Sequence, residues 1–591
     1  MTQRTINRIL VANRGEIALR IMRTCHEMGI GTVAVYGDGE EHAQHVLYAD
    51  DAWRIPDGQG LPYLRINALL EIAHKSGAEA VHPGYGFLAE NADFARAVQN
   101  AGLIFIGPPA DAIAAMGDKV EARRIARSAG VEPVPGTTEP VETIDDALSW
   151  TETHGYPVAV KASGGGGGRG FRVARSADEM KDAFEGSRGE AERYFSNPEV
   201  YLERYIEQPR HIEVQVFAGA QGEVLAFPER ECSIQRRHQK LIEETPSPAV
   251  DVQLRERLER ATISLVEAVD YLGVGTVEYL LDADGSFYFL EMNTRIQVEH
   301  TVTEMVTGID IVQAQIQAAM GLPLGFTRDE VEPSGWSIEC RINAEDAARQ
   351  FAPVTGMLTK YLPPDGFGVR VDSALVQGDR ILPAYDSMIA KLIVWGRDRD
   401  EAIARMYRAL KDYQIEGVPT TIPFHKRMME HEAFGAGETT TTFLANHPEV
   451  LEGYSPADMP AQEEQTPGSP ALALVVEVGG RRFDVAVSGL PTNGGSRRQS
   501  GRTHRPGPPK SGSGGAGSGN DLISPIQGTV LRVAVEKGQT VARGDLVCVV
   551  EAMKMENEMT AHRDGIISAL NVVAGATVQI SGIIATIEDL E

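Results

Sequence analysis

Short apolar runs alternate with amphipathic stretches through the first hundred residues. Strands are predicted at residues 6–12, 31–36, 80–81 and 104–106, and helices between them at 16–28, 67–76 and 91–101. Such alternation is typical of a parallel sheet covered on both faces, with ligands at the turns that follow its strands. We therefore expect an N-terminal α/β domain that binds a ligand.

A glycine run follows another apolar strand. Val158–Lys161 leads into Gly164–Gly168, and a further strand-like run begins at Phe171. A glycine run can be a flexible linker, but its position between two strands favours a hairpin. The backbone of that hairpin would close over phosphate groups, with Lys161 as a fixed cation. The Gly-Lys-Ser/Thr ending of a P-loop is absent, so this is a different kind of nucleotide loop.

Asp284-Gly285 is a strong signal for a two-residue hairpin turn between apolar strands at 277–281 and 287–291. With this turn, Leu281 faces Tyr288, and Glu278 faces Glu291 at about 5 Å between Cβ atoms. Opposed carboxylates repel each other unless a cation lies between them. Two solvated glutamates on an edge strand are the alternative, which the apolar and aromatic neighbours disfavour. Glu278, Glu291 and the amide of Asn293 are therefore interpreted as ligands of Mg²⁺ or Mn²⁺.

Beyond this hairpin, the alternate residues Arg295, Gln297 and Glu299 share one face if the segment is extended. They offer a cation, an amide and a carboxylate. Bicarbonate needs positive charge to hold it and a base to take its proton, so this face is a candidate bicarbonate site.

The C-terminal stretch contains an internal duplication. Gly528, Val535 and Gly538 recur 37 positions later, with matching apolar strands, so a small duplicated β domain is predicted. Lys554 lies between the two copies in Ala-Met-Lys-Met, where a hairpin tip is expected. Such a lysine is either an ordinary solvated charge or an attachment point for a cofactor, and the duplication favours the second.

Charge and cysteine usage narrow the class of protein. The formal net charge of −27 argues against a nucleic-acid partner, and it means that an anionic ligand needs a locally basic pocket. No apolar run approaches the roughly 18 residues of a membrane span, and the first strand begins too early for a signal peptide. The four cysteines are far apart and lack metal-ligand spacing, which fits reduced thiols in a cytoplasmic protein.

Longer motifs accompany these features: Ala12-Asn13-Arg14-Gly15-Glu16-Ile17, His82-Pro83-Gly84-Tyr85-Gly86, Ser233-Ile234-Gln235-Arg236-Arg237-His238-Gln239-Lys240 and Glu339-Cys340-Arg341-Ile342-Asn343-Ala344-Glu345. With these motifs, residues 4–445 resemble biotin carboxylase of the ATP-grasp class. Residues 521–588, with Lys554 in its methionine setting, resemble the biotinyl carrier domain of biotin-dependent carboxylases.

The resemblance implies roles for individual residues. ATP would be bound by Lys119, Lys161, Gly164, Gly165, Gly166, Gly167, Gly168, Glu203, Arg204, Ile206, His211, Gln235 and His238. Bicarbonate would be held by Lys240, Arg295, Gln297 and the backbone of Val298, and the metal by Glu278, Glu291 and Asn293. Glu299 would be the catalytic base, Arg341 would stabilise the biotin enolate, and Lys554 would carry covalent biotin. Phe171 and Arg204 stand where the family often has Met and Lys, which concerns nucleotide affinity rather than the chemistry.

The resemblance also implies an architecture that mixes α/β and α+β domains. We expect an N-terminal α/β domain (1–117), an ATP-grasp domain (118–330) with a mobile lid at about 130–205, a C-terminal biotin carboxylase domain (331–450) and an all-β duplicated carrier domain (521–591). Residues 451–493 contain a predicted hairpin that would dock on the carboxylase domain or on a partner chain. Residues 494–520 are rich in Gly, Ser and Pro, and a coil of about 27 residues spans roughly 30 Å.

The implied activity is ATP- and bicarbonate-dependent carboxylation of biotin on Lys554, by way of carboxyphosphate. Residues 450–520 are too few for a carboxyltransferase, so we expect the α subunit of an acyl-CoA carboxylase (acetyl- or propionyl-CoA type). It would work in an oligomeric complex with a carboxyltransferase β subunit, and a biotin protein ligase would modify it. The alternatives are the biotin-bearing subunit of a two-chain pyruvate carboxylase and a lipoyl-type carrier fused to another ATP-grasp ligase. Neither nucleic acid nor a membrane is an expected partner.

Overall fold

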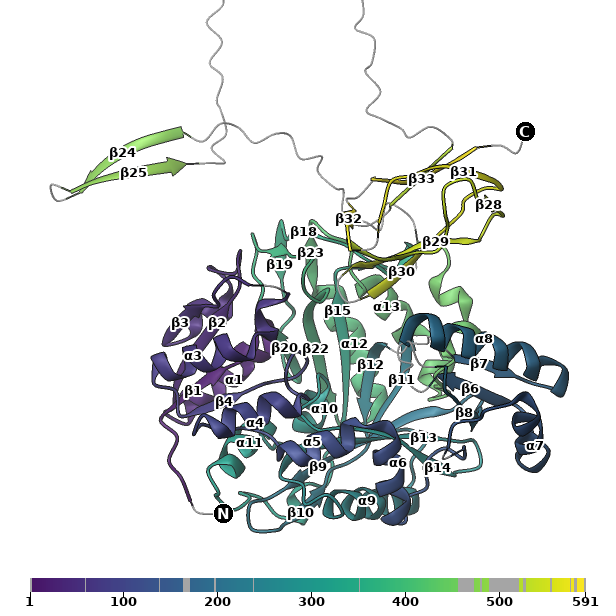
Figure 1. Ribbon diagram of the computed structural model, residues 1–591. Coiled ribbons are helices and arrows are strands. Elements are labelled where there is room, and N and C mark those ends of the chain that lie inside the picture. Colours follow the sequence, from purple (N-terminus) through teal and green to yellow (C-terminus); the bar gives the residue numbers. More distant parts are fainter. Residues whose placement is uncertain are drawn as a thin grey trace, which may run out of the picture. The chain divides into compact units, whose positions relative to one another are not determined.

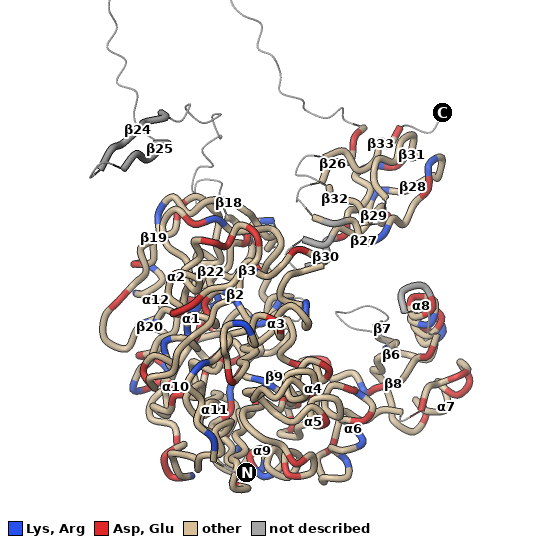
Figure 2. The backbone as a smooth tube through the Cα atoms, turned by 60° about the vertical axis from the view of Figure 1, so that its left-hand side comes forward, with Lys and Arg blue, Asp and Glu red and all other residues tan. Residues whose placement is uncertain are grey.

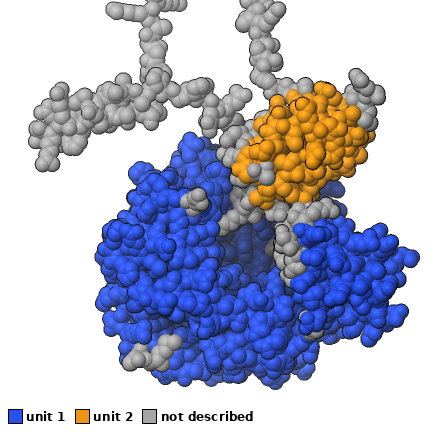
Figure 3. Space-filling model, viewed as in Figure 1, with its two compact units in different colours: residues 1–458 blue, residues 459–591 orange. Residues whose placement is uncertain are grey.

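The computed structural model forms two compact units, Met1–Asp458 (unit 1) and Met459–Glu591 (unit 2) (Figures 1 and 3). It describes residues 3–454, except 59, 138, 163–170, 196–197, 237–238 and 350, and then 472–478, 481–487, 520–524, 528–552, 555–573, 575–578 and 582–588. Among these residues, no helix combines the length and the apolar character needed to cross a membrane.

The N-terminal part of unit 1 is the predicted parallel sheet, with the order β3-β2-β1-β4-β5. Its strands are β1 (Arg8–Val11), β2 (Gly31–Tyr36), β3 (Asp51–Arg54), β4 (Ala80–His82) and β5 (Ile104–Phe105). The apolar pattern does not predict β3, because this edge strand is short and has a charged residue at each end. The connections contain α1 (Gly15–Glu27), α2 (Gln44–Tyr48), η1 (Pro62–Leu64), α3 (Ile66–Ser76), α4 (Ala92–Asn100) and α5 (Ala110–Gly117).

Both faces of this sheet are covered, as the pattern predicts. Ile9 and Val11 of β1 pack into one core with α1 and with α11 (Ile311–Ala319). Leu10 and Ala12 point to the other core, which contains residues of α3, α4 and α5. Because successive residues of one strand enter opposite cores, the strands read as continuous apolar runs.

The largest element of unit 1 is an antiparallel sheet with the order β14-β13-β9-β11-β12-β15-β22-β20, in which β10 also pairs with β9. Its strands are β9 (Arg210–Ala218), β10 (Val224–Ala226), β11 (Arg230–Arg236), β12 (Gln239–Thr245), β13 (Gly273–Leu281), β14 (Phe287–Asn293), β15 (Trp336–Asn343), β20 (Val369–Ser373) and β22 (Met388–Gly396). Helices α9 (Val252–Glu267), α10 (His300–Thr307) and α12 (Arg399–Asp412) pack against it. The β12–β15 pairing joins strands from the two sides of the boundary expected at residues 330 and 331.

A smaller layer holds the stretch expected to act as a lid. Its sheet has the order β7-β6-β8, with β6 (Val158–Ala162), β7 (Phe171–Ala174) and β8 (Val200–Arg204), beside α7 (Ile144–His154) and α8 (Ala177–Phe195) (Figure 1). The preceding helix α6 (Lys119–Ser128) packs instead on β14 of the large sheet. Val158, Phe184 and Leu202 belong to a core of their own. This segment therefore has the separate packing that a lid requires.

Short elements complete unit 1. They are η2 (Arg328–Glu330), β16 (Glu345–Asp346), η3 (Ala347–Arg349), β17 (Ala352–Pro353), β18 (Gly356–Met357), β19 (Lys360–Leu362), β21 (Arg380–Ile381), β23 (Gln414–Glu416), α13 (Ile422–Glu430), α14 (Glu432–Gly435), α15 (Phe443–Asn446) and η4 (Pro448–Leu451).

The carboxylate hairpin differs in one respect from the prediction. Glu278 faces Glu291 as expected, but Leu281 faces Phe287 rather than Tyr288. The turn is longer than two residues, with the Asp282 N–H donating to the Ser286 carbonyl at 2.8 Å. A bulge next to Glu278 compensates for the longer turn, so the register predicted for the glutamates is correct although the predicted turn is wrong.

Unit 2 contains the predicted hairpin, β24 (Leu472–Val478) and β25 (Arg481–Val487), and a β domain of two four-stranded sheets. The orders β30-β29-β27-β32 and β26-β33-β31-β28 are built from β26 (Asp521–Ile523), β27 (Gly528–Val533), β28 (Thr540–Val541), β29 (Leu546–Ala552), β30 (Met555–Thr560), β31 (Gly565–Leu570), β32 (Thr577–Val578) and β33 (Ile583–Glu588).

The pairing confirms the predicted duplication. Val530 faces Val550 in one sheet, and their counterparts Ile567 and Ile587 face each other in the second sheet, with a bulge at the same place. Each copy contributes its short strand to the sheet of the other copy: β32 of the second copy pairs with β27 of the first, and β28 of the first copy pairs with β31 of the second. Neither copy therefore forms a complete sheet by itself.

Candidate active site

Strand β9 separates an apolar face of the large sheet from a polar one. Ile212 and Val214 pack into a core with α9 and β13. His211, Glu213 and Gln215 alternate with them and are buried on the opposite face. Buried polar groups cost free energy unless they are paired, so a polar face at the centre of a sheet indicates a functional site.

Three glutamates stand in a row across this face. Glu213 on β9 lies opposite Glu278 on β13, and Glu278 lies opposite Glu291 on β14. Neighbours of this kind are about 5 Å apart at Cβ, so their charges repel. Glu213 and Glu278 are buried, whereas Glu291 is exposed. The row therefore needs cations along its length.

Lys240 on β12 supplies one of them. Its Nζ donates to Oε2 of Glu213 at 2.5 Å, to Oε1 of Glu278 at 3.0 Å and to Oε1 of Glu299 at 2.7 Å. Burial would lower the pKa of Lys240, but the three carboxylates outweigh it and raise that pKa well above its usual value. Burial likewise opposes ionisation of Glu278, yet Lys240 and His211 hold its pKa well below the usual range.

Glu299 lies in the turn that precedes α10 and binds two cations. Its Oε1 accepts from Lys240, and its Oε2 accepts from Arg341 on β15 at 2.9 Å. Burial raises the pKa of Glu299, but Lys240, Arg341 and Arg230 more than offset this and hold it well below the usual value. Arg341 also donates to Glu243 at 2.6 Å, and burial raises the pKa of that carboxyl to about 7 despite the arginine.

The segment after β14 reaches the same carboxylates by a different route from the one expected. Residues 294–299 are not extended but bend and turn into α10, so the extended conformation considered from the sequence is wrong. Because the chain folds back, Asn293 Nδ2 and Gln297 Nε2 both donate to Oε1 of Glu278 at 2.8 Å. Arg295 donates to Oδ1 of Asn293 at 2.8 Å and to Glu90 at 2.9 Å.

A buried lysine, Lys391, donates a hydrogen bond to the backbone of Val298. Lys391 on β22 donates to the Val298 carbonyl at 2.9 Å, and it lies 3.4 Å from Glu16 and 3.8 Å from Asp372. The position of the Val298 backbone therefore depends on a cation more than ninety residues further along the chain.

The residues expected to hold a metal fit that role in charge. Glu291 is exposed as a whole residue, but the surrounding protein reduces the hydration of its carboxyl group. That desolvation and the facing Glu278 raise the pKa of Glu291, while Lys119 lowers it only in part. A raised carboxyl pKa indicates uncompensated negative charge, which a divalent cation between Glu278 and Glu291 would neutralise. The donor set consists of oxygens, as Mg²⁺ and Mn²⁺ prefer. Oδ1 of Asn293 would join it on release from Arg295.

The residues expected to bind nucleotide fall into two groups. His211 and Gln235 belong to the polar face, with Gln235 Nε2 3.3 Å from His211 Nδ1 and His211 Nε2 3.0 Å from Glu278. Lys161 on β6 instead pairs with Glu203 on β8, in the lid segment.

Three more of these residues border the lid segment. Arg204 on β8 donates to Asp282 at 3.1 Å and to the Tyr288 hydroxyl at 3.3 Å. Ile206 is buried just after β8, and Lys119 is the first residue of α6. Gly164–Gly168, His238 and Lys554 lie outside the described residues.

Arg230 on β11 is the main site residue that the motifs do not reveal. It is completely buried, and it donates to Glu213 at 2.5 Å and to Gln297 at 2.7 Å. It also donates to Gln215, Thr303 and Thr276. The signal in the sequence that could have located this network is the polar alternation of His211, Glu213 and Gln215 within an otherwise apolar strand.

One fully buried and two partly buried cations provide the local positive charge that an anionic ligand needs in this acidic chain. Lys240, Arg230 and Arg341 gather on one face of one sheet, whereas Lys/Arg and Asp/Glu are interspersed along the rest of the unit 1 backbone (Figure 2). The space-filling view shows unit 1 hollowed on the side that faces the reader (Figure 3). An anion would thus meet positive charge locally, despite the negative charge of the chain as a whole.

Four family descriptions match the chain in order. "Biotin carboxylase, N-terminal domain" matches residues 5–113, and "Carbamoyl-phosphate synthase L chain, ATP binding domain" matches residues 118–327. "Biotin carboxylase C-terminal domain" matches residues 339–446, and "Biotin-requiring enzyme" matches residues 520–587.

Individual proteins match over long stretches. The biotin-dependent acyl-coenzyme A carboxylase alpha3 subunit of Mycobacterium leprae is 44% identical over 594 residues, covering 99% of both chains. The propionyl-CoA carboxylase alpha chain of Ruegeria pomeroyi is 36% identical over 688 residues, covering 98% of this chain and 100% of that one.

Among solved structures, a similar one is the biotin carboxylase domain dimer of Hydrogenobacter thermophilus 2-oxoglutarate carboxylase, in complex with MgADP, ADP and bicarbonate. It has a TM-score of 0.72 and 45% identity, and it covers 77% of this chain and 100% of that one.

Proposed function

We propose that this chain, which belongs to the biotin-dependent carboxylases, is the α subunit of an acyl-CoA carboxylase. It is a biotin carboxylase joined to a biotinyl domain, and it would use ATP and bicarbonate to carboxylate biotin attached to Lys554. The carboxyl group would then pass to acetyl-CoA or propionyl-CoA on a separate carboxyltransferase β subunit.

One observation carries the chemical part of this proposal: Glu299 shares its two oxygens between Lys240 and Arg341. A carboxylate with its pKa held far below the usual range is ionised but is a poor base. An anion that binds Lys240 and Arg295 would draw positive charge away from Glu299, which raises its pKa toward the value needed to accept a proton. Bicarbonate would therefore activate the base that deprotonates it.

Gln297 and the Val298 backbone would orient the bicarbonate. Gln297 is fixed between Arg230 and Glu278, and Lys391 fixes the Val298 carbonyl. Groups held in this way lose little further freedom when the anion binds, so the binding free energy is retained.

Nucleotide and metal would occupy the neighbouring edge of the same face. Glu278, Glu291 and Asn293 would hold Mg²⁺ or Mn²⁺, which neutralises phosphate charge. Lys119, Lys161, the loop Gly164–Gly168, Glu203, Arg204, Ile206, His211, Gln235 and His238 would contact ATP. The similar solved structure is in complex with MgADP and bicarbonate, which supports a nucleotide and metal site in this part of the chain.

Arg341 would supply positive charge beside the reacting atoms. Its guanidinium keeps a raised pKa, because Glu243 and Glu299 outweigh its burial, so it stays charged throughout. Biotin, when bound, supplies the ureido nitrogen that accepts the carboxyl group. A permanent cation at this position favours negative charge on that ring.

Lys554 is the proposed attachment point of biotin. It falls between β29 and β30, where Ala552 pairs with Met555, and within the match to the biotin-requiring enzymes. The match over 99% of both chains to a biotin-dependent carboxylase subunit favours biotin over the lipoyl alternative. Lys554 would be modified by a biotin protein ligase.

The acyl-CoA acceptor rests on the two relatives that match this chain almost from end to end, since both are named as α subunits or α chains of acyl-CoA carboxylases. Residues 447–519, between the matches to the C-terminal and biotin-requiring domains, also leave little room for a carboxyltransferase. The first point favours an acyl-CoA carboxylase subunit over a pyruvate carboxylase subunit, and the second favours a carboxyltransferase on a separate chain.

The test is to isolate the biotinylated chain together with the protein that co-purifies with it, and to assay acetyl-CoA, propionyl-CoA and pyruvate as carboxyl acceptors. We expect bicarbonate- and ATP-dependent carboxylation of at least one acyl-CoA. Turnover of pyruvate alone would overturn the proposed acceptor. An unbiotinylated chain after exposure to biotin protein ligase, judged by intact mass, would overturn the assignment of Lys554.

A further inference from the structure

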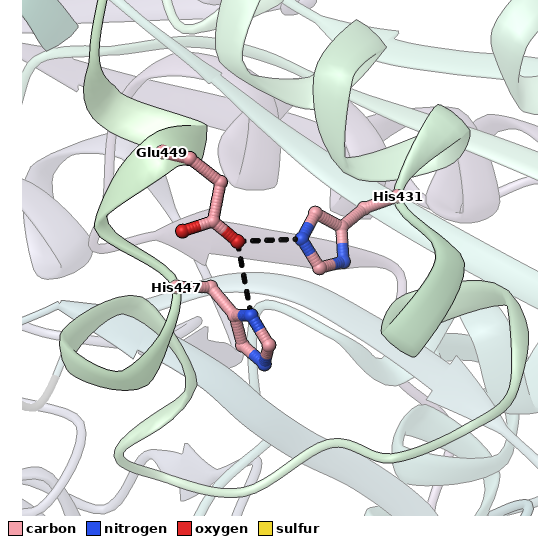
Figure 4. A group of neighbouring side chains, drawn as sticks. All are labelled: His431, His447 and Glu449. Carbon is pink, nitrogen blue, oxygen red and sulfur yellow. Dashed lines mark hydrogen bonds and ion pairs between the residues drawn. The ribbon is translucent and has the colours of Figure 1, made fainter.

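We propose that His431, His447 and Glu449 bind a divalent transition-metal ion, with Zn²⁺ the best match, near the end of the described part of unit 1 (Figure 4). This site lies outside the polar face of the large sheet. It shares no residue with the Glu278, Glu291 and Asn293 set.

The three side chains converge from two segments. His431 lies between α13 and α14, while His447 and Glu449 lie at the start of η4. Oε1 of Glu449 is 3.2 Å from Nε2 of His431 and 3.1 Å from Nδ1 of His447 (Figure 4). All three candidate ligand atoms lie within 4.8 Å of one another.

These separations match a zinc site. Zn²⁺ binds histidine nitrogen and carboxylate oxygen at about 2.0–2.2 Å in tetrahedral geometry, which places neighbouring ligand atoms roughly 3.3 Å apart. The two carboxylate-to-nitrogen distances already have that length, so an ion could enter with small side-chain movements.

Packing holds the two imidazoles in place before any ion binds. Phe443, which is 1% exposed, lies with its ring centroid 5.3 Å from His431 and 4.5 Å from His447. The backbone N–H of His447 donates to the backbone carbonyl of Phe443 at 2.9 Å, which fixes the main chain that carries the imidazole. A site whose ligands are fixed in advance loses less entropy on binding.

Solvent can reach the site from one side. The Glu449 side chain is 58% exposed and that of His447 is 32% exposed, whereas that of His431 is 17% exposed. Two histidines and one carboxylate leave the fourth zinc position for water, and the exposed side gives the ion an access route.

The ligand types decide which metal is expected. Imidazole nitrogen favours Zn²⁺, Ni²⁺ and Cu²⁺ over Mg²⁺, which prefers oxygen. His431 Nδ1 is buried without a hydrogen-bond partner among the described residues, and the lack of such an outer partner costs about 10- to 100-fold in metal affinity. We therefore expect a weaker site than a closed structural zinc site, one that fastens η4 to the α13–α14 junction.

The experiment is a Zn²⁺ titration of the full chain without nucleotide, on wild type and on the Glu449→Gln, His447→Gln and His431→Gln variants. His74→Gln, which changes an exposed histidine of α3, is the matched control. Each of the three variants should bind one Zn²⁺ fewer than wild type, while His74→Gln should bind the same number. Co²⁺ should give wild type the visible absorption of a tetrahedral site, and the variants should lack that absorption.

Thermal melting separates loss of the site from loss of the fold. Metal-free variants should melt close to wild type, and Zn²⁺ should raise the melting temperature of wild type and His74→Gln by more than that of the three variants. Equal Zn²⁺ stoichiometry and equal melting shifts in wild type and Glu449→Gln would mean that the three residues are only a hydrogen-bonded cluster, and would overturn the proposal.

Discussion

Replacing Arg230 by lysine tests how far a single buried cation braces the bicarbonate side of the site. Arg230 is completely buried and donates to five side chains, with Glu213 at 2.5 Å, Gln297 at 2.7 Å, Gln215 at 2.8 Å, Thr303 at 3.0 Å and Thr276 at 3.2 Å. Lysine keeps the charge but offers three N–H groups from one point instead of five in a planar fork.

The expected loss of stability follows from that difference. At least two of the five acceptors lose their donor, and a buried group left unsatisfied costs about 1–3 kcal/mol, so the substitution should cost about 2–6 kcal/mol. The lower half of this range is expected because two of the acceptors are threonine hydroxyls, which rotate. Glu213 keeps Lys240, so the larger cost of an unpaired buried charge is not added.

The assay combines urea unfolding with bicarbonate-dependent ATP cleavage. Because Gln297 loses its anchor, the KM for bicarbonate should rise while the KM for ATP changes little. Arg328→Lys is the matched control, since the Arg328 side chain is 67% exposed and its ion pair with Glu259 is near the solvent, where such a pair is worth about 1 kcal/mol or less. If Arg230→Lys unfolds at the same urea concentration as Arg328→Lys and keeps the wild-type KM for bicarbonate, Arg230 does not brace the site.

Three further substitutions test other parts of the molecule. Glu299→Gln should abolish bicarbonate-dependent ATP cleavage while ATP binding persists, because the proposed base is lost; isothermal titration with ATP and a phosphate-release assay check both. Lys554→Arg should spare carboxylation of free biotin but stop that of acyl-CoA, as measured by incorporation of labelled bicarbonate. Burial raises the pKa of Glu345 from 4.5 to about 7, so ionisation of Glu345 destabilises the fold as the pH rises. Glu345→Gln should therefore stabilise the chain by up to about 3 kcal/mol above pH 7, and the gain should vanish below about pH 4, where the carboxyl is protonated in both the folded and the unfolded state.

Each of these outcomes has a contrary result. Retained bicarbonate-dependent ATP cleavage in Glu299→Gln would remove Glu299 as the base. Acyl-CoA carboxylation by Lys554→Arg would place biotin elsewhere. A stability gain for Glu345→Gln that does not depend on pH would contradict the raised pKa, and the exposed Glu152→Gln serves as its control because no burial cost is released there.

Local patterns predicted much of the fold. The parallel sheet, the carboxylate hairpin and the duplicated β domain all follow from apolar periodicity and turn residues, which are properties of contiguous residues. The pattern failed where those signals are weak or compensated. Edge strand β3 has a charged residue at each end, and the turn at Asp284-Gly285 is longer than its dipeptide suggests, with a bulge beside Glu278 that restores the register.

Some contacts of the candidate site could likewise be predicted from local sequence, and others could not. Glu278 opposite Glu291 could be derived from a turn and a count of residues. The contacts of Arg230 could not, because its partners lie 15 to 73 positions away, on β9, β13, α10 and the turn before α10. Arg295, Gln297 and Glu299 stay candidates for binding bicarbonate, but the bend that brings Gln297 to Glu278 depends on tertiary packing rather than on strand periodicity.

The sequence by itself determined most strands and helices, the duplication around Lys554 and the residue types available for chemistry, because each of these depends on residues that are close together along the chain. Only the tertiary structure decided which charges meet. Glu299 binds Lys240 across 59 positions and Arg341 across 42, and these pairings set its pKa. They depend on the registers and bulges of one large sheet, which are set by packing over the whole of unit 1 and cannot be read from any local stretch.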